Sequence, residues 1–165
     1  MICRLRTPRA VVALLTGPNG RWPRYLAVSR SSSLKSMTVL IVENEAIVRM
    51  ELADRLCAMG LTALAAADAD EAIILLDAHP EIELLMTDIA MPGSMDGARL
   101  AHHVRRRWPP VKIIVTSGYS DTSLADLPRG ANFLAKPYWP EALSDALRAM
   151  IGGGGSWKPQ VVGGA

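Results

Sequence analysis

Five short apolar runs, rich in β-branched residues, are separated by longer segments in which apolar residues recur every three or four positions. The runs are TVLIV (38–42), LTALA (61–65), ELLMT (83–87), KIIVT (112–116) and NFLA (132–135). They predict strands, and the segments between them have the spacing of amphipathic helices. Alternation of strand and helix is typical of a parallel sheet with helices on both faces. We therefore expect an α/β fold of five parallel strands and five helices.

The ends of the expected helices carry recognisable signals. Gly60 stops the first helix, and Pro140 suits the first turn of the last one. Asp68 is followed three residues later by Glu71, which is the pattern of a capping box. The expected helices are 46–59, one from Asp68, one from Asp96, a short one within 121–128 and one from Pro140.

Charge divides the chain into three parts. Residues 1–36 hold seven basic and no acidic side chains, whereas residues 37–151 hold ten basic and 16 acidic side chains, a net charge of −6. Residues 152–165 are rich in glycine and are typical of a flexible tail. The sequence thus predicts one acidic domain over residues 37–151.

The basic segment 1–36 predicts no fold of its own. Its apolar stretch AVVALL is shorter than the core of a typical signal peptide, and the run SRSSS is typical of disorder. We interpret the segment as a disordered extension, and Met37 as an alternative start directly before the first strand. A second interpretation stays open, in which the basic arm contacts nucleic acid or anionic lipid.

Residues that carry chemistry stand where four of the strands end. In chain order they are Glu43 and Asn44, Asp88, Thr116, and Lys136. Each is ordinary when taken singly, since an aspartate after a strand is most often a turn former. The carboxyl ends of parallel strands meet at one edge of a sheet, where α/β proteins bind their ligands. Together these residues predict a site of acids, a hydroxyl and an ammonium.

The motifs VLIVENE, TDIAMPGSMDG, IIVTSGY and FLAKPY resemble the receiver domain of two-component response regulators, over about residues 38–151. The resemblance implies a flavodoxin-like fold with strand order 2-1-3-4-5. It implies that Asp88 is the phosphoacceptor, that Lys136 and Thr116 assist it, and that Thr116 and Phe133 form the conformational switch. It also implies a cis bond between Lys136 and Pro137.

A magnesium cofactor follows from the same resemblance. Its implied ligands are Glu43, Asn44, Asp88 and the backbone carbonyl of Ala90. The chemistry is reasonable, because a phosphoryl group brings about two negative charges to one point and Mg²⁺ prefers hard oxygen ligands. Lys136 supplies a further positive charge.

The resemblance also implies partners. A histidine kinase or a histidine phosphotransfer protein would supply the phosphoryl group. An unknown downstream protein would contact the face formed by the fourth helix, the fifth strand and the fifth helix. The domain would act as a phosphoacceptor and not as an enzyme, apart from self-catalysed phosphotransfer and dephosphorylation.

Other classes of function are disfavoured by the sequence. No helix-turn-helix follows Ile151, so we expect no nucleic-acid binding by the domain itself. No apolar run approaches the roughly 18 residues of a membrane span. Two cysteines at unrelated positions, Cys3 and Cys57, indicate neither a disulfide framework nor a metal site, and we expect a cytoplasmic location.

Several positions depart from the usual receiver pattern. Asn44 stands where an acidic metal ligand is usual, Phe133 where a tyrosine is common, and the loop PGSMDG is one residue longer than the commonest form. Asn44 keeps an alternative open, an unphosphorylated pseudo-receiver that serves as an adaptor with the same fold. A phosphatase of the haloacid dehalogenase type is disfavoured, because that class has a D-x-D motif where this chain has ENE.

Overall fold

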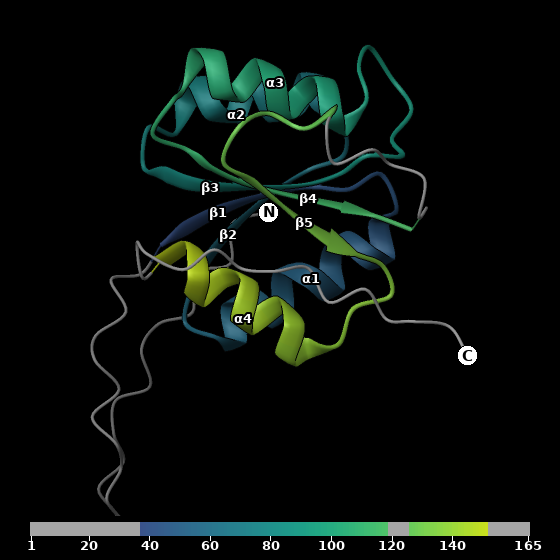
Figure 1. The fold of residues 1–165 in the computed structure, drawn as a ribbon, viewed down its shortest axis with the longest axis vertical. Helices are drawn as coiled ribbons and strands as arrows, with labels where there is room; N and C mark the ends of the chain where they lie inside the picture. The colour runs from purple at the N-terminus through teal and green to yellow at the C-terminus, as the bar shows by residue number, and fades with distance from the viewer. Residues whose placement is uncertain (1–36, 119–125, 152–165) are drawn as a thin grey trace, which may run out of the picture.

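Five parallel strands form one sheet in the order β2-β1-β3-β4-β5 (Figure 1). The computed structural model describes residues 37–118 and 126–151. The strands are β1 (Thr38–Val42), β2 (Thr62–Ala66), β3 (Ile82–Asp88), β4 (Lys112–Ser117) and β5 (Ala131–Ala135). The predicted fold class and strand order are confirmed. Each strand lies within one residue of its predicted position.

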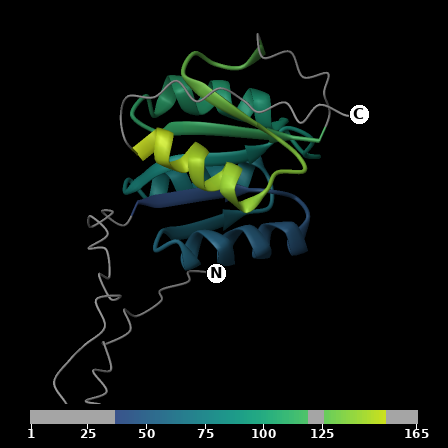
Figure 2. The ribbon, with the colours of Figure 1, turned by 60° about the horizontal axis from the view of Figure 1, so that its bottom comes forward.

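Helices cover both faces of the sheet. The helices are α1 (Ala46–Ala58), α2 (Ala69–Ala78), α3 (Gly97–Arg107) and α4 (Pro140–Ile151). In both views α2 and α3 lie over one face, and α1 and α4 lie over the other (Figures 1 and 2). The described residues contain four helices where we expected five, because the short helix expected within 121–128 falls mostly on residues 119–125, outside the described part. Our predictions for residues 1–36 and 152–165 also lie outside it.

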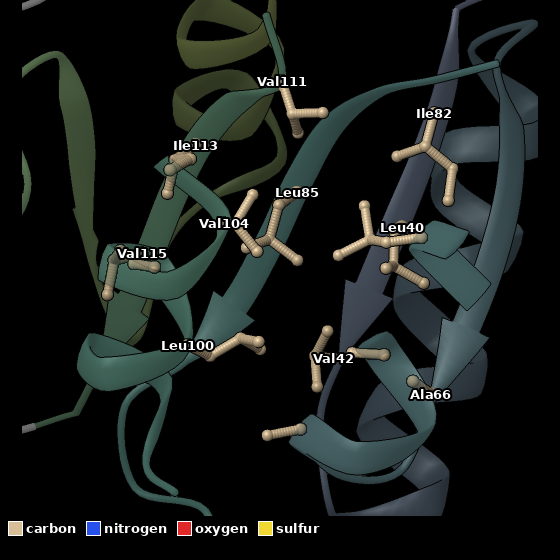
Figure 3. Packing of buried hydrophobic residues seen from close by; sticks show 14 of the residues in the cluster. Leu40, Val42, Ala66, Ile82, Leu85, Leu100, Val104, Val111, Ile113 and Val115 are labelled. Carbon is tan, nitrogen blue, oxygen red and sulfur yellow. The ribbon is translucent and has the colours of Figure 1, made fainter. Parts of the chain in front are cut away.

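Each face of the sheet has its own apolar core. The core beneath α2 and α3 gathers residues of alternate strand positions, such as Leu40, Val42 and Leu85, against Leu100 and Val104 of α3 (Figure 3). The intervening strand positions, such as Val39, Ile41 and Met86, pack against α1 and α4. A sheet buried on both faces explains why its central strands read as continuous apolar runs.

The helix starts predicted from capping signals are present. The Glu71 amide donates to Asp68 Oδ1 at 2.9 Å, and the Arg99 amide donates to Asp96 Oδ1 at 2.8 Å. In the capping box of α2, Glu71 Oε2 accepts from the amide of Ala67, at 2.8 Å, and not from that of Asp68 itself. These caps fix where the helices leave the strand ends.

No helix in the described ranges, 37–118 and 126–151, is both long and apolar enough to cross a membrane.

Gly97 brings the start of α3 against the end of β3. A Cβ atom at this position would lie 1.8 Å from the carbonyl oxygen of Asp88 and 2.8 Å from Thr87 Oγ1. The amide of Gly97 donates to the carbonyl of Ile89 at 3.2 Å. Only a glycine lets these two backbone segments approach so closely, and the contact sets the position of Asp88.

We predict that Gly97→Ala lowers the free energy of unfolding by at least about 2–3 kcal/mol, because a methyl group pressed against a buried backbone forces β3 and α3 apart. Urea unfolding measures the change. Gly118→Ala is the matched control, since nothing lies within 4 Å of its added Cβ. An equal loss in both variants would show that the close approach at Gly97 is not what matters.

Candidate functional site

The carboxyl ends of β1, β3, β4 and β5 bring the residues singled out in the sequence to one edge of the sheet. Glu43 follows β1, Asp88 ends β3, and Lys136 follows β5. Register places Asp88 directly beside Thr116 on β4. The strands are parallel, so all these ends share one edge.

Lys136 joins two carboxylates. Its Nζ donates to Glu43 Oε2 at 2.7 Å and to Asp88 Oδ2 at 2.8 Å. Glu43 is 3% exposed and Asp88 is 8% exposed, so both acids are buried. Buried charges persist only when they are paired and hydrogen-bonded, and one ammonium between two carboxylates meets this condition for both.

Backbone contacts hold Lys136 over the site. The Lys136 amide donates to the carbonyl of Ser117 at 2.7 Å, and so continues the β4–β5 ladder past the end of β5. The peptide bond between Lys136 and Pro137 is cis, as the resemblance predicts.

Electrostatics leave this cluster with a deficit of positive charge. Two carboxylates and one ammonium sum to −1. Burial by itself would lower the pKa of Lys136, but its hydrogen bonds to Asp88 and Glu43 and their charges outweigh burial and raise that pKa above its ordinary value. Lys136 therefore stays charged. The net negative charge of the cluster would attract a further cation.

Arg49 closes the loop between β1 and α1. Its guanidinium donates to the backbone carbonyl of Glu43 and, at 3.2 Å, to that of Asn44. The Glu45 amide donates to Glu43 Oε1 at 3.1 Å. Sequence reasoning missed Arg49, because an arginine in the first turns of a helix has no pattern that distinguishes it from a solvated surface residue.

Thr116 and Phe133 occupy the positions that the resemblance assigns to a switch. Thr116 is buried, and its hydroxyl lies 3.4 Å from the carbonyl oxygen of Thr87, to which it donates a long hydrogen bond. Phe133 is partly exposed and pairs with Val115 in the β4–β5 register. The Thr116 hydroxyl is thus turned to the backbone of β3 and held only weakly.

Around Asp88, at the carboxyl edge of the sheet, which we call the mouth of the site, lie oxygen atoms of the type that a hard divalent cation prefers. Their total negative charge is low. Glu43 and Asp88 are the carboxylates there, while Asn44 and Ala90 are exposed beside them. The Ala90 amide donates to Asp88 Oδ1 at 3.4 Å, a long bond that leaves this oxygen accessible to a ligand. Residues 37–118 and 126–151 contain no group of three or more His, Cys, Asp or Glu side chains placed to hold a metal. Asn44, at the position that the resemblance assigns to a metal ligand, carries an amide and no negative charge.

The family model described as the response regulator receiver domain matches residues 39–148. The chain belongs to the response regulator receiver domain family. Receiver domains are phosphoacceptors of two-component signalling that work with histidine kinases and typically bind Mg²⁺. The resemblance drawn from the motifs is confirmed.

Relatives and solved structures agree with this assignment. The chain is 36% identical over 120 residues to the sensor kinase CckA of Brucella abortus (strain 2308), covering 70% of this chain and 13% of that protein. It is 33% identical over 114 residues to the transcriptional regulatory protein PdtaR of Mycobacterium tuberculosis (strain H37Rv), covering 68% of this chain and 54% of that protein.

Two crystal structures show the same architecture. The receiver domain of the hybrid histidine kinase CckA is 32% identical with a TM-score of 0.60, over 69% of this chain and 98% of that one. A response regulator receiver protein from Sinorhizobium medicae WSM419 is 25% identical with a TM-score of 0.67, over 73% of this chain and 98% of that one. The chain spans only a small part of the full-length sensor kinase CckA, so the likeness concerns the receiver domain alone.

We predict that Lys136 makes stability depend on alkaline pH. Because the folded-state pKa is raised, the contribution of Lys136 is fully present below its ordinary pKa of about 10.5 and is lost as pH rises through the higher folded value. Urea unfolding between pH 8 and pH 11 should show a decline above about pH 10.5 that is steeper for the wild type than for Lys136→Gln. Parallel declines would contradict the prediction, since both proteins share all other titrating groups.

Proposed function

We propose that this receiver domain accepts a phosphoryl group on Asp88 from a histidine kinase or a histidine phosphotransfer protein and signals through contact with another protein. The observation that carries the proposal is the Lys136 ammonium shared by Asp88 and Glu43. A carboxylate that attacks a phosphoryl group must approach another anion. An ammonium shared by two carboxylates supports this step, because its positive charge lets anions lie close together.

The proposed step is a transfer between two nucleophiles. Lys136 occupies Asp88 Oδ2, which leaves Oδ1, at the long 3.4 Å bond from the Ala90 amide, as the attacking atom. A bond forms from Oδ1 to phosphorus while the bond from phosphorus to the donor's imidazole nitrogen breaks. The imidazole leaves with that electron pair and takes up a proton from water. Lys136 then neutralises part of the charge on the acyl phosphate.

Magnesium fits this site as the second source of positive charge. Glu43, Asp88, the amide oxygen of Asn44 and the carbonyl of Ala90 are the proposed ligands. When bound, Mg²⁺ would supply charge neutralisation for the incoming phosphoryl oxygens. The net charge of −1 on Glu43, Asp88 and Lys136 favours binding of a cation, but less than the three carboxylates usual in the family would.

The proposed readout begins at Thr116. Its hydroxyl is held by a single 3.4 Å bond to the Thr87 carbonyl, so a phosphoryl oxygen on the neighbouring Asp88 would compete well for it. Movement of Thr116 would free space for Phe133, which has no hydroxyl and would report by packing alone. Among the described elements, the proposed output face joins β5 and α4.

The second candidate function is a pseudo-receiver that binds partners without phosphorylation. Asn44 favours it, because an exposed amide stands where the resemblance places an acidic metal ligand, and a site that binds no cation would transfer no phosphoryl group. In either case the chain acts without enzymatic turnover of a separate substrate. We place it in the cytoplasm, where histidine kinases present their phosphorylated domains.

Apolar side chains around the mouth of the site support docking of a donor protein there. Among the described residues, four large apolar side chains are strongly exposed, and three of them flank the site: Ile47 at 81%, Met50 at 61% and Trp139 at 71%. Ile47 and Met50 lie in the first half of α1, three and six residues after Asn44, and Trp139 lies three residues after Lys136. An open pocket of about 470 Å³ lies beside Lys136, lined by the apolar or aromatic Val48, Leu52, Pro137 and Tyr138, the charged Glu51, Arg55 and Lys136, and Gly118.

A donor must cover this mouth to bring its phosphohistidine to Asp88, so we propose that these apolar residues receive it. Burial raises the pKa of the Tyr138 hydroxyl, so this lining residue stays neutral.

The decisive experiment is incubation with acetyl phosphate and Mg²⁺ followed by intact-mass measurement. The wild type should gain the mass of one phosphoryl group, and Asp88→Asn should gain none, because the amide lacks the nucleophilic oxygen anion. Asp96→Asn, which changes a half-exposed acid at the cap of α3, serves as the control and should be labelled like the wild type. A labelled Asp88→Asn protein would refute the assignment of Asp88.

We predict that Asn44→Asp tightens Mg²⁺ binding by about 1 kcal/mol, or roughly fivefold in Kd, because affinity in oxygen sites rises with ligand charge. Calorimetric titration of Mg²⁺ measures this. Asn44→Ala should bind more weakly than the wild type, because it loses the amide oxygen. If all three proteins bind Mg²⁺ equally, Asn44 is not at the metal; if none binds Mg²⁺ or accepts phosphate, the pseudo-receiver function is supported.

For donor docking we predict that Ile47→Asp and Trp139→Ala each slow phosphotransfer from a phosphorylated histidine phosphotransfer protein about tenfold or more, as loss of an interface anchor does. Labelling by acetyl phosphate should stay unchanged, since a small donor needs no docking surface. Ile74→Asp is the matched control, because Ile74 is 67% exposed on α2, across the sheet from α1. Equal slowing by Ile74→Asp would contradict docking at the mouth.

A further inference from the structure

The outer surface of α2 and α3 combines opposite charges in two adjacent ridges. Helix α2 carries Asp70, Glu71 and Asp77 and no basic residue. Helix α3 carries four arginines and two histidines and no acidic residue. The two helices lie side by side over the same face of the sheet (Figures 1 and 2). We call this surface the α2–α3 face.

The ridges are level with each other. Ser94, in the loop before α3, donates to Asp70 Oδ1 at 2.7 Å near the start of α2. At the other end Arg107 donates to Asp77 Oδ1 at 2.8 Å. Because each helix follows a strand of the same parallel sheet, the helices also run in the same direction.

The spacing of charges in one ridge matches that in the other. Asp70 and Asp77 are seven residues apart, as are Arg99 and Arg106, and seven residues span two helical turns, or ~10.5 Å. Midway on α2 lies Ile74, a large apolar side chain that is 67% exposed. Midway on α3 lie His102 and His103.

The basic ridge has charge that acidic side chains of the described residues do not neutralise. In the described part of the chain Arg106 forms no ion pair, and Arg99 reaches only its own N-cap, with 3.8 Å between Arg99 Nε and Asp96 Oδ2. A shallow pocket of about 540 Å³ runs along this ridge, lined by Ser94, Met95, Arg99, His102, His103 and Arg106.

We propose that the α2–α3 face binds a second copy of this chain about a two-fold axis. If the axis is parallel to the helices, α2 of each copy lies over α3 of the other copy. Asp70 then lies opposite Arg99 of the other copy, and Asp77 lies opposite its Arg106. An axis across the helices would set acid on acid and base on base. Charge therefore selects the first arrangement, which is self-complementary, as a two-fold interface requires.

Ile74 supplies the apolar centre of this interface. In the selected arrangement it meets the pocket beside His102 and His103, between the two pairs of opposite charges. Exposed ion pairs contribute little individually, so the association is weak and depends strongly on salt. The proposal is independent of the proposed function, because it uses neither Asp88 nor Lys136.

Sedimentation velocity of the full chain tests the proposal, at concentrations up to roughly 300 μM, the range in which small interfaces associate. We expect a monomer–dimer equilibrium in about 50 mM salt that shifts to monomer in about 500 mM salt, as screening requires. A wild type that stays monomeric throughout overturns the proposal.

Variants locate the interface. Arg106→Glu and Ile74→Asp should each raise the dimer Kd at least tenfold. Arg148→Glu makes the same change of charge on α4, over the opposite face of the sheet, and should leave the Kd unchanged. Thermal unfolding followed by circular dichroism verifies that each variant is folded. A dimer that tolerates both Arg106→Glu and Ile74→Asp uses another surface and refutes the α2–α3 face.

A charge swap tests the pairing itself. A chain with Arg106→Glu alone would set an acid against Asp77 of the other copy, and a chain with Asp77→Lys alone would set a base against Arg106, so each should be monomeric. Mixed in equal amounts, the two variants restore one original pair and one reversed pair and should form heterodimers. Failure of the mixture to associate overturns the pairing of Asp77 with Arg106.

Discussion

A single ammonium group between two buried carboxylates holds the functional edge of the sheet together. Glu43 comes from the end of β1, Asp88 from β3 and Lys136 from beyond β5, so the ammonium spans β4 to reach its partners. Without Lys136 the two buried acids would repel each other, with no positive charge from the described residues between them. The same acids also contact neighbouring segments, because Glu43 accepts from the amide of Glu45 in the loop to α1 and the backbone of Asp88 lies against the start of α3.

Much of this architecture is predictable from the sequence. Short continuous apolar runs predicted the buried strands. Together with Gly60 and the Asp68–Glu71 pair as helix signals, they were enough to predict the order and type of the elements. The site was predictable because parallel strands bring their carboxyl ends together, whatever the loops do. The second strand shows the limit: it is one residue later than predicted, since a run of small residues such as LTALAA has little period to define its start.

The rest of the site depends on distances that a sequence does not encode. Arg49 contacts the backbone of Glu43 and Asn44, and no spacing rule marks one surface arginine as the residue that closes a loop. The contact between Gly97 and the Asp88 carbonyl arises from the packing of α3 on β3, while in the sequence Asp96-Gly97 reads only as a helix start. In the capping box, Glu71 accepts from the amide of Ala67. The local backbone conformation determines this partner, and the sequence motif does not.

The contact at Gly97 has a mechanical consequence. An α-helix is stiff along its axis, and the first residue of α3 abuts the carbonyl of Asp88 with no side chain between them to deform. Any shift of the Asp88 backbone is therefore transmitted to α3 as the movement of a rod, without slack. At the far end of α3, Arg107 forms an exposed ion pair with Asp77 of α2. A charge added at Asp88 that shifts its backbone would in this way also displace the far end of α3, more than two helical turns away.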